Sequence, residues 1–114
     1  MTIEQILSRI KKFRDERDWM QFHDPTNMAI SVIIEAAELL EHFQWKSKSE
    51  VKKYVKQNRA VIQDEIADIA MYLFEMADNL DIDLLHAMDA KLKKNAKKYP
   101  IAKAKGKHTK YDRL

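Results

Sequence analysis

The stretch MAISVIIEAAELL, residues 28–40, decides the fold class of this 114-residue chain. Placed on a helix, its side chains are apolar nearly all round, apart from two glutamates spaced three residues apart. Asp24 followed by Pro25 predicts the start of this helix, because proline suits the first helical position after a capping residue. A helix that is apolar on most sides is buried on most sides. In so short a chain, this predicts that a partner subunit covers part of it.

Glycine and cysteine usage narrows the classes of protein that remain. The chain has a single glycine, Gly106, and no cysteine. One glycine excludes the glycine-rich phosphate loops, and it also removes the residues that two-residue hairpins prefer. The lack of cysteine excludes disulfide scaffolds and thiol catalysis. We therefore predict an all-α fold, a bundle of four to five helices, whose chemistry comes from its side chains.

Capping residues place the other helices along the chain. Their predicted extents are Thr2 to about Trp19, Pro25 to about Phe43, a short piece that starts at Ser47, Asn58 to about Leu80, and Asp81 or Asp83 to Pro100. The short piece and the helix after it are equally consistent with one continuous helix. Residues 1–100 then form a single helical domain, and residues 101–114 a basic, mobile C-terminal tail.

Charge is divided unevenly along the chain, although the net charge is only +3. Residues 91–114 hold nine lysines and one arginine against one aspartate, which gives +9, whereas residues 1–90 hold 11 basic and 17 acidic groups, which gives −6. An acidic body argues against a general nucleic-acid surface. The basic end either contacts a small polyphosphate or is a solvated tail.

The N-terminus and the apolar runs predict a location in the cytoplasm. Charged residues interrupt the first 13 residues too often for a signal peptide. The longest uncharged stretch, residues 25–34, is far shorter than the roughly 20 residues that cross a bilayer. We therefore expect no membrane association.

Two pairs of acidic residues interrupt the apolar helices at the same spacing. Glu35 and Glu38 form the first pair, and Glu65 and Asp68 form the second. Residues three apart lie on one side of a helix, so each pair projects together. An exposed face is the usual place for a single such pair. Two pairs within apolar helices instead predict a buried group of four carboxylates, which needs a counter-charge. Hard oxygen ligands favour Mg²⁺, with Mn²⁺ acceptable, over zinc or iron.

Two further groups of residues are candidates for binding a substrate. Lys91, Asn95 and Lys98 share one face of the last helix and suit polyphosphate oxygens, although a solvated basic face is the usual alternative. Aromatic rings at two helix ends could sandwich a nucleobase by stacking, with ordinary core packing an equal alternative for each tryptophan. This aromatic group consists of Trp19, Phe22 and His23 at one end and Phe43 and Trp45 at the other. Tyr72 continues the stripe of Asp68 along its helix.

Five motifs in this order resemble the all-α nucleoside triphosphate pyrophosphohydrolase superfamily, the MazG-like proteins, and most closely its dCTP pyrophosphatase branch. They are RDWMQFH at residues 17–23, Glu35-x-x-Glu38, FQWK at residues 43–46, Glu65-x-x-Asp68, and the stretch Lys91-x-x-x-Asn95-x-x-Lys98-Tyr99-Pro100. The resemblance covers nearly the whole chain. One residue departs from it, because close dCTP-cleaving relatives carry a histidine where this chain has Ile10.

The resemblance implies a Mg²⁺-dependent enzyme that cleaves a nucleoside triphosphate to the monophosphate and pyrophosphate, with dCTP or a modified dCTP as the expected substrate and nucleotide-pool house-cleaning as its role. Glu35, Glu38, Glu65 and Asp68 are then the metal ligands, and Glu35 or Glu38 is the catalytic residue that orients or deprotonates the attacking water. Lys91, Asn95, Lys98 and Tyr99 would hold the phosphates and sugar, and Trp19, His23 and Trp45 would lie around the base. Tyr72 is a further residue predicted to bind the substrate. The family implies a homotetramer built from dimers, or a homodimer.

Two other classes of protein remain as alternatives. A di-iron carboxylate bundle normally needs Glu-x-x-His on two helices, and none of Glu35, Glu38, Glu41 or Glu65 has a histidine three residues later. A helical oligomer without enzymatic activity could bind nucleic acid through the basic tail. That protein would show salt-sensitive binding that disappears when residues 101–114 are removed.

Overall fold

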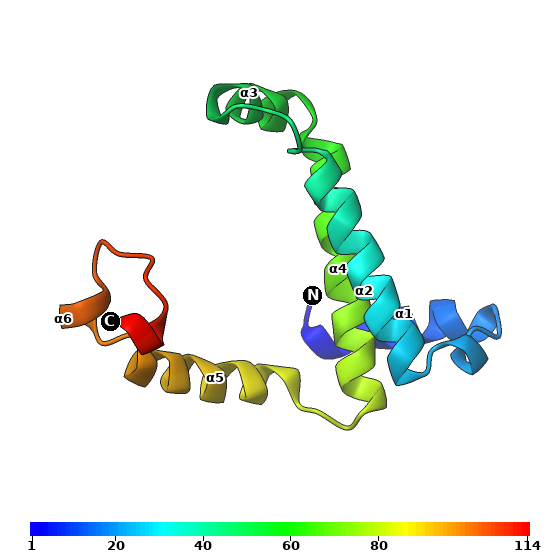
Figure 1. Cartoon of the computed structure of the whole chain (residues 1–114). Coiled ribbons are helices and arrows are strands. Elements are labelled where there is room, and N and C mark those ends of the chain that lie inside the picture. The colour runs from blue at the N-terminus through cyan, green and yellow to red at the C-terminus, as the bar shows by residue number, and fades with distance from the viewer. The chain divides into compact units, whose positions relative to one another are not determined.

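The computed structural model describes all residues, 1–114, and every regular element in it is a helix (Figure 1). The elements are α1 (Ile3–Glu16), the 3-10 helix η1 (Met20–Phe22), α2 (Pro25–Glu41), α3 (Lys48–Gln57), α4 (Arg59–Asn79), α5 (Leu84–Lys98), α6 (Ile101–Ala104) and the 3-10 helix η2 (Tyr111–Arg113). The prediction of an all-α fold is confirmed.

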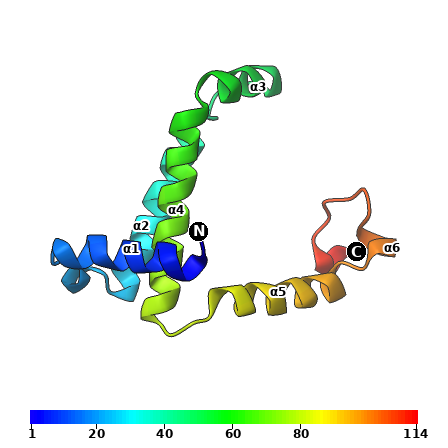
Figure 2. The same ribbon diagram turned by 180° about the vertical axis from the view of Figure 1, so that it is seen from behind.

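The chain forms two compact units, Met1–Leu80 and Asp81–Leu114. In the first unit, α2 and α4 lie side by side and run in opposite directions, and α1 packs against α4 (Figures 1 and 2). The second unit contains α5, α6 and η2. The predicted division into a domain of residues 1–100 and a mobile tail of residues 101–114 stays a prediction.

Side-chain caps fix where most of the helices begin. Thr2 and Ser47 each form a capping box, and the side chain of Asp24 accepts a hydrogen bond from the Asn27 backbone at 2.8 Å, with Pro25 at the first helical position. Asp83, one of two candidates from the sequence, caps α5. Four helices therefore start at a predicted capping side chain, whereas Asn58 precedes α4 as predicted but makes no side-chain cap hydrogen bond.

The ends of α1 and α2 differ from the predictions by three and two residues. The helix α1 ends at Glu16 rather than near Trp19, because Asp18 adopts a positive φ of 55° that a right-handed helix does not allow. The helix α2 ends at Glu41, and the turn after it includes Trp45 with a φ of 65°. The residues of the predicted aromatic group lie in these two turns or directly after them.

The chain buries few side chains completely. Met28, Ile62 and Ala77 are the buried apolar residues. In contrast, α2 and α4 leave many apolar side chains exposed, among them Ile30, Ile33, Ile34, Leu40, Val61, Ile66 and Leu73. These exposed faces agree with the expectation that a partner subunit covers them, and the oligomer stays a prediction.

None of the helices combines the length and the apolar composition that a membrane crossing requires. The location in the cytoplasm stays a prediction from the sequence.

Candidate metal centre

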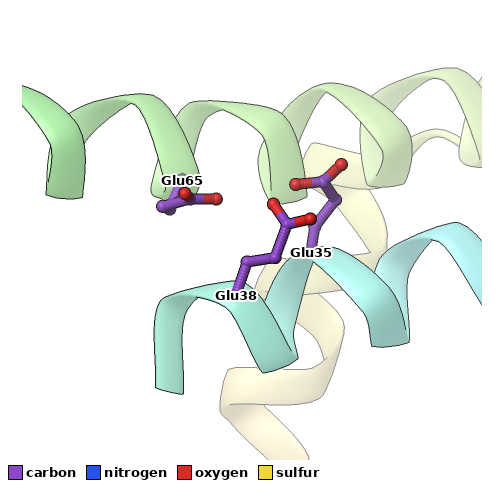
Figure 3. Close-up of side chains that lie close together, drawn as sticks. All are labelled: Glu35, Glu38 and Glu65. Carbon is purple, nitrogen blue, oxygen red and sulfur yellow. The ribbon is translucent and has the colours of Figure 1, made fainter. Parts of the chain in front are cut away.

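Three of the four predicted carboxylates meet between α2 and α4. Glu35 and Glu38 project from α2 toward α4, and Glu65 projects from α4 (Figure 3). One carboxylate oxygen from each lies within 4.8 Å of the others. The antiparallel packing of the two helices brings the two pairs together from positions about 30 residues apart in the sequence. A single metal ion could therefore contact all three side chains.

All three members of the cluster are carboxylates, so none of them supplies a positive charge. Oε2 of Glu35 and Oε2 of Glu65 are buried and have no hydrogen-bond partner. Burial, followed by the hydrogen bond and charge of Glu38 and the charges of Asp68 and Glu65, raises the pKa of Glu35 to about 7. Burial also raises the pKa of Glu65, with a further contribution from Glu38, whereas His42 acts in the opposite direction. Such a group is stable either with a shared proton or with a bound cation.

The donor atoms fit a hard divalent cation. All of them are carboxylate oxygens, the ligand type that Mg²⁺ and Mn²⁺ prefer. The two buried oxygens without partners are the atoms that a cation would satisfy. Asp68 lies outside this group of three, although it is near enough for its charge to raise the pKa of Glu35. The assignment of all four residues as ligands stays a prediction.

A hollow of about 370 Å³ adjoins the carboxylates. Of the four predicted metal ligands, Glu35 and Asp68 line this hollow. Three of the residues predicted to bind the substrate, Trp19, His23 and Tyr72, also line it, as does Ile10. Its wall is completed by Ile6, Arg9, Phe13, Arg14, Met71 and Glu75. A flat aromatic group could enter this hollow while a charged group beside it reached the carboxylates.

Trp45 differs from Trp19, His23 and Tyr72, as do Phe22 and Phe43, because none of the three lines the hollow. Trp45 is 91% exposed, in the turn after α2. Of the two tryptophans predicted to stack on a base, Trp19 therefore lines the hollow and Trp45 is exposed to solvent. A role for Trp45 beside the base stays a prediction.

The predicted phosphate-binding residues belong to the second unit. Lys91, Asn95 and Lys98 lie on α5, and Tyr99 follows as its C-terminal cap. Lys98 Nζ lies 4.6 Å from the centre of the Tyr111 ring, which itself meets Tyr99 edge to face. Their role toward a substrate stays a prediction.

A buried polar network lies beside the hollow, and the sequence patterns indicated only part of it. Oε2 of Glu75 lies 2.7 Å from His23 Nδ1, accepts a hydrogen bond from Asn79 Nδ2 at 3.1 Å and lies 4.0 Å from Arg14 Nη1. Arg14 and Glu75 are 7% and 3% exposed. The hydrogen bond from Arg14 to Asp15 is the main cause that raises the pKa of Arg14. Arg14 lies on the apolar side of its helix, one turn after Ile10, a signal that was available in the sequence.

His42 is a further residue near the carboxylates that the sequence motifs did not indicate. It caps the C-terminus of α2, with Nε2 3.6 Å from Oε1 of Glu65 and Nδ1 2.6 Å from the hydroxyl of Tyr54. Its position four residues after Glu38 places both on one side of the helix, which is a signal, but a weak one.

Comparisons with known proteins point to one family. A protein-family model described as the MazG-like family matches residues 30–114. The chain is 36% identical to dCTP pyrophosphatase 1 of Rattus norvegicus and of Homo sapiens, in each case over 115 residues that cover 99% of this chain and 68% of the relative. A crystal structure of a pyrophosphatase from Archaeoglobus fulgidus superposes with a TM-score of 0.82 at 40% identity, covering 85% of this chain and 91% of that one.

Proposed function

The chain belongs to the MazG-like family and is a nucleotide pyrophosphatase, and on that basis we propose that it uses Mg²⁺ to cleave dCTP, or a modified dCTP, to the monophosphate and pyrophosphate. The observation that carries this proposal is the cluster of Glu35, Glu38 and Glu65, with two buried oxygens that lack partners, beside a hollow lined by aromatic rings. The relatives named dCTP pyrophosphatase 1 support the choice of substrate.

The residues divide the work of cleaving the bond between the α and β phosphates. Glu35, Glu38, Glu65 and Asp68 would hold the cation. When bound, the cation neutralises charge on the phosphates and lowers the barrier to attack by water. Glu35 or Glu38 orients the water or takes its proton. Lys91, Asn95, Lys98 and Tyr99 hold the phosphates and the sugar.

The hollow accommodates the base. Trp19 and Tyr72 offer ring faces, and stacking of this kind contributes about 1 to 3 kcal/mol per base. His23, held by Glu75, offers a polar group at the same wall. Trp45 does not line the hollow, and it would contact the base from the turn after α2.

Assembly into a homotetramer, a dimer of dimers, or into a homodimer would cover the exposed apolar face of α2. Ile33 and Leu40 are 69% and 60% exposed in the single chain, which is unusual for side chains of this size. Light scattering after size-exclusion chromatography measures the mass directly. A monomer at micromolar concentration would contradict the proposed assembly.

A panel of ribo- and deoxynucleoside triphosphates with Mg²⁺ tests the reaction and the substrate together. We expect monophosphate and pyrophosphate as products, with dCTP or a modified dCTP cleaved with the highest kcat/KM. Preference for another base would replace the substrate, and failure to hydrolyse every compound would contradict the proposed reaction.

Substitution of one carboxylate tests the site itself. We expect Glu35→Gln to abolish turnover while circular dichroism shows an unchanged helical content. Glu41→Gln is the matched control, because Glu41 is an exposed glutamate on the same helix. Full activity in Glu35→Gln would show that the reaction does not use this cluster.

A further inference from the structure

His42 lies between two side chains that come from different helices. It follows the last residue of α2 and reaches Tyr54 of α3 on one side and Glu65 of α4 on the other. The two ring nitrogens are used separately, Nδ1 toward the Tyr54 hydroxyl at 2.6 Å and Nε2 toward Oε1 of Glu65 at 3.6 Å. The His42 side chain is 15% exposed, so water competes little for either nitrogen.

Simple hydrogen-bond chemistry says how each ring nitrogen can be used. A metal-bound Glu65 is ionised, and an ionised carboxylate only accepts hydrogen bonds. Nε2 is the ring nitrogen that faces Oε1 of Glu65, so an N–H at this position points its hydrogen at the carboxylate. Nδ1 lies within hydrogen-bond distance of the Tyr54 hydroxyl, and that contact holds the ring in place whichever of the two atoms carries the hydrogen.

This arrangement distinguishes the two oxygens of Glu65. Oε1 faces His42, whereas Oε2 is buried and has no partner. A carboxylate that is held through one oxygen keeps the other in a fixed direction. That fixed direction is what a metal ligand needs, because a freely rotating side chain loses entropy when the ion binds.

We propose that His42 is a positioning residue for the metal centre, held by Tyr54, and that it fixes Glu65 so that Oε2 is the oxygen presented to the divalent cation. The inference rests on the proposed function, since it assumes that Glu65 is a ligand. It gives α3 a part in the site, because Tyr54 transmits the position of that helix to the carboxylate. Lys46, whose Nζ lies 4.4 Å from the centre of the Tyr54 ring, restrains the tyrosine in turn.

A purely structural role for the same contacts makes a different prediction. If His42 only ties the end of α2 to α3, its loss lowers the stability of the chain and leaves metal affinity unchanged. Metal affinity measured without substrate therefore separates the two roles.

The test is a calorimetric titration of Mn²⁺ into the metal-free full chain, with circular dichroism as the measure of folding. We expect His42→Leu to weaken Mn²⁺ binding by about 10- to 100-fold, the range typical for residues that orient metal ligands. Tyr54→Phe keeps the ring and removes only the hydroxyl, so it should have a smaller effect in the same direction. In the double variant, Tyr54→Phe should add nothing, because its effect acts through His42.

The matched control is His86→Leu, which removes an exposed histidine of α5 and should leave Mn²⁺ affinity unchanged. A folded His42→Leu variant with Mn²⁺ affinity within about twofold of the wild type would overturn the proposal. If His42→Leu does not fold, Tyr54→Phe decides by the same criterion. A wild-type chain that binds no Mn²⁺ would contradict the proposed function itself, whereas wild-type binding that His42→Leu does not change contradicts only the role of His42.

Discussion

Glu65 and Glu75 lie on the same helix, ten residues or about 15 Å apart, and both are removed from solvent to a large extent. Around Glu75 the chain supplies His23, Asn79 and Arg14. Around Glu65 it supplies two more carboxylates, and His42 is the one group in contact that lowers the pKa of Glu65. One glutamate of this helix is thus surrounded by hydrogen-bond donors and a positive charge, and the other mainly by further carboxylates.

The difference separates a carboxylate that the chain itself satisfies from one that is a proposed metal ligand. A buried carboxylate is stable when donors and cations from the chain surround it, as they do at Glu75. Where the neighbours are other carboxylates and oxygens remain without partners, the missing charge has to come from outside the chain. Variants that remove one member from each end test this contrast.

Glu75→Ala should cause the largest loss of stability. It leaves Arg14, 7% exposed, with Asp15 as its only remaining ion-pair partner. It also removes the partner of His23 and Asn79, and breaking a buried charge pair from one side costs about 3 to 5 kcal/mol. Urea unfolding of the metal-free chain at fixed protein concentration measures this. Asp64→Ala, which removes an exposed carboxylate from the same helix, should stay within about 0.5 kcal/mol of the wild type. An equally small change in Glu75→Ala would mean that the network carries no stability.

Glu65→Gln should have the opposite effect on the metal-free protein. Removing one of three clustered negative charges relieves their repulsion, so the metal-free variant should be more stable than the wild type. Its turnover with Mg²⁺ should fall by about 100-fold or more, because a ligand is lost. Thermal unfolding in a chelator and product release measure the two effects, with Asp64→Asn as the control. A less stable metal-free variant would contradict the view that this cluster stores repulsion.

The stability of the metal-free protein should depend on pH because the pKa of Glu35 is raised in the folded chain. The pKa of this glutamate rises from 4.5 to about 7 on folding, so over that range the folded chain holds a proton that the unfolded chain has lost. Its contribution to stability is therefore complete below pH 4.5 and declines as the pH rises to about 7. Melting temperatures of the wild type minus those of Glu35→Gln isolate this contribution, and saturating Mg²⁺ should offset the decline. A difference that does not vary with pH would contradict the raised pKa.

Asn79→Ala should have the smallest effect of these changes. It removes the hydrogen bond to Glu75 and the bond at 3.2 Å from Arg14, but leaves the opposite charges paired. We expect a loss of about 1.5 kcal/mol, the scale of hydrogen bonds to charged groups. Urea unfolding beside Glu75→Ala gives the comparison. A loss as large as that of Glu75→Ala would mean that Asn79, and not the charge pair, holds the network together.

Local patterns in the sequence predicted the features that depend on neighbours a few residues apart. The helix starts at Thr2, Asp24 and Ser47 and the pairing of Glu35 with Glu38 follow from spacing alone. Their convergence with Glu65 required only that two apolar helices pack together.

The partners of Arg14 and His42 could not be predicted in the same way. Arg14 meets Asn79, 65 residues later, and His42 meets Glu65 across two helices. These contacts depend on how α1, α2 and α4 cross, which periodicity does not specify. The place of Trp45 at a helix end likewise predicts neither its positive φ nor its exposure to solvent.

The short list of buried residues, Met28, Ile62, Ala77, Arg14 and Glu75, also has a consequence for how the protein responds to dilution. In the proposed oligomer, a chain of 114 residues with so little interior of its own would draw part of its folding free energy from association. Folding and assembly are then one equilibrium, and the melting temperature rises with protein concentration. The amount of protein present thus becomes a determinant of how much of it is folded.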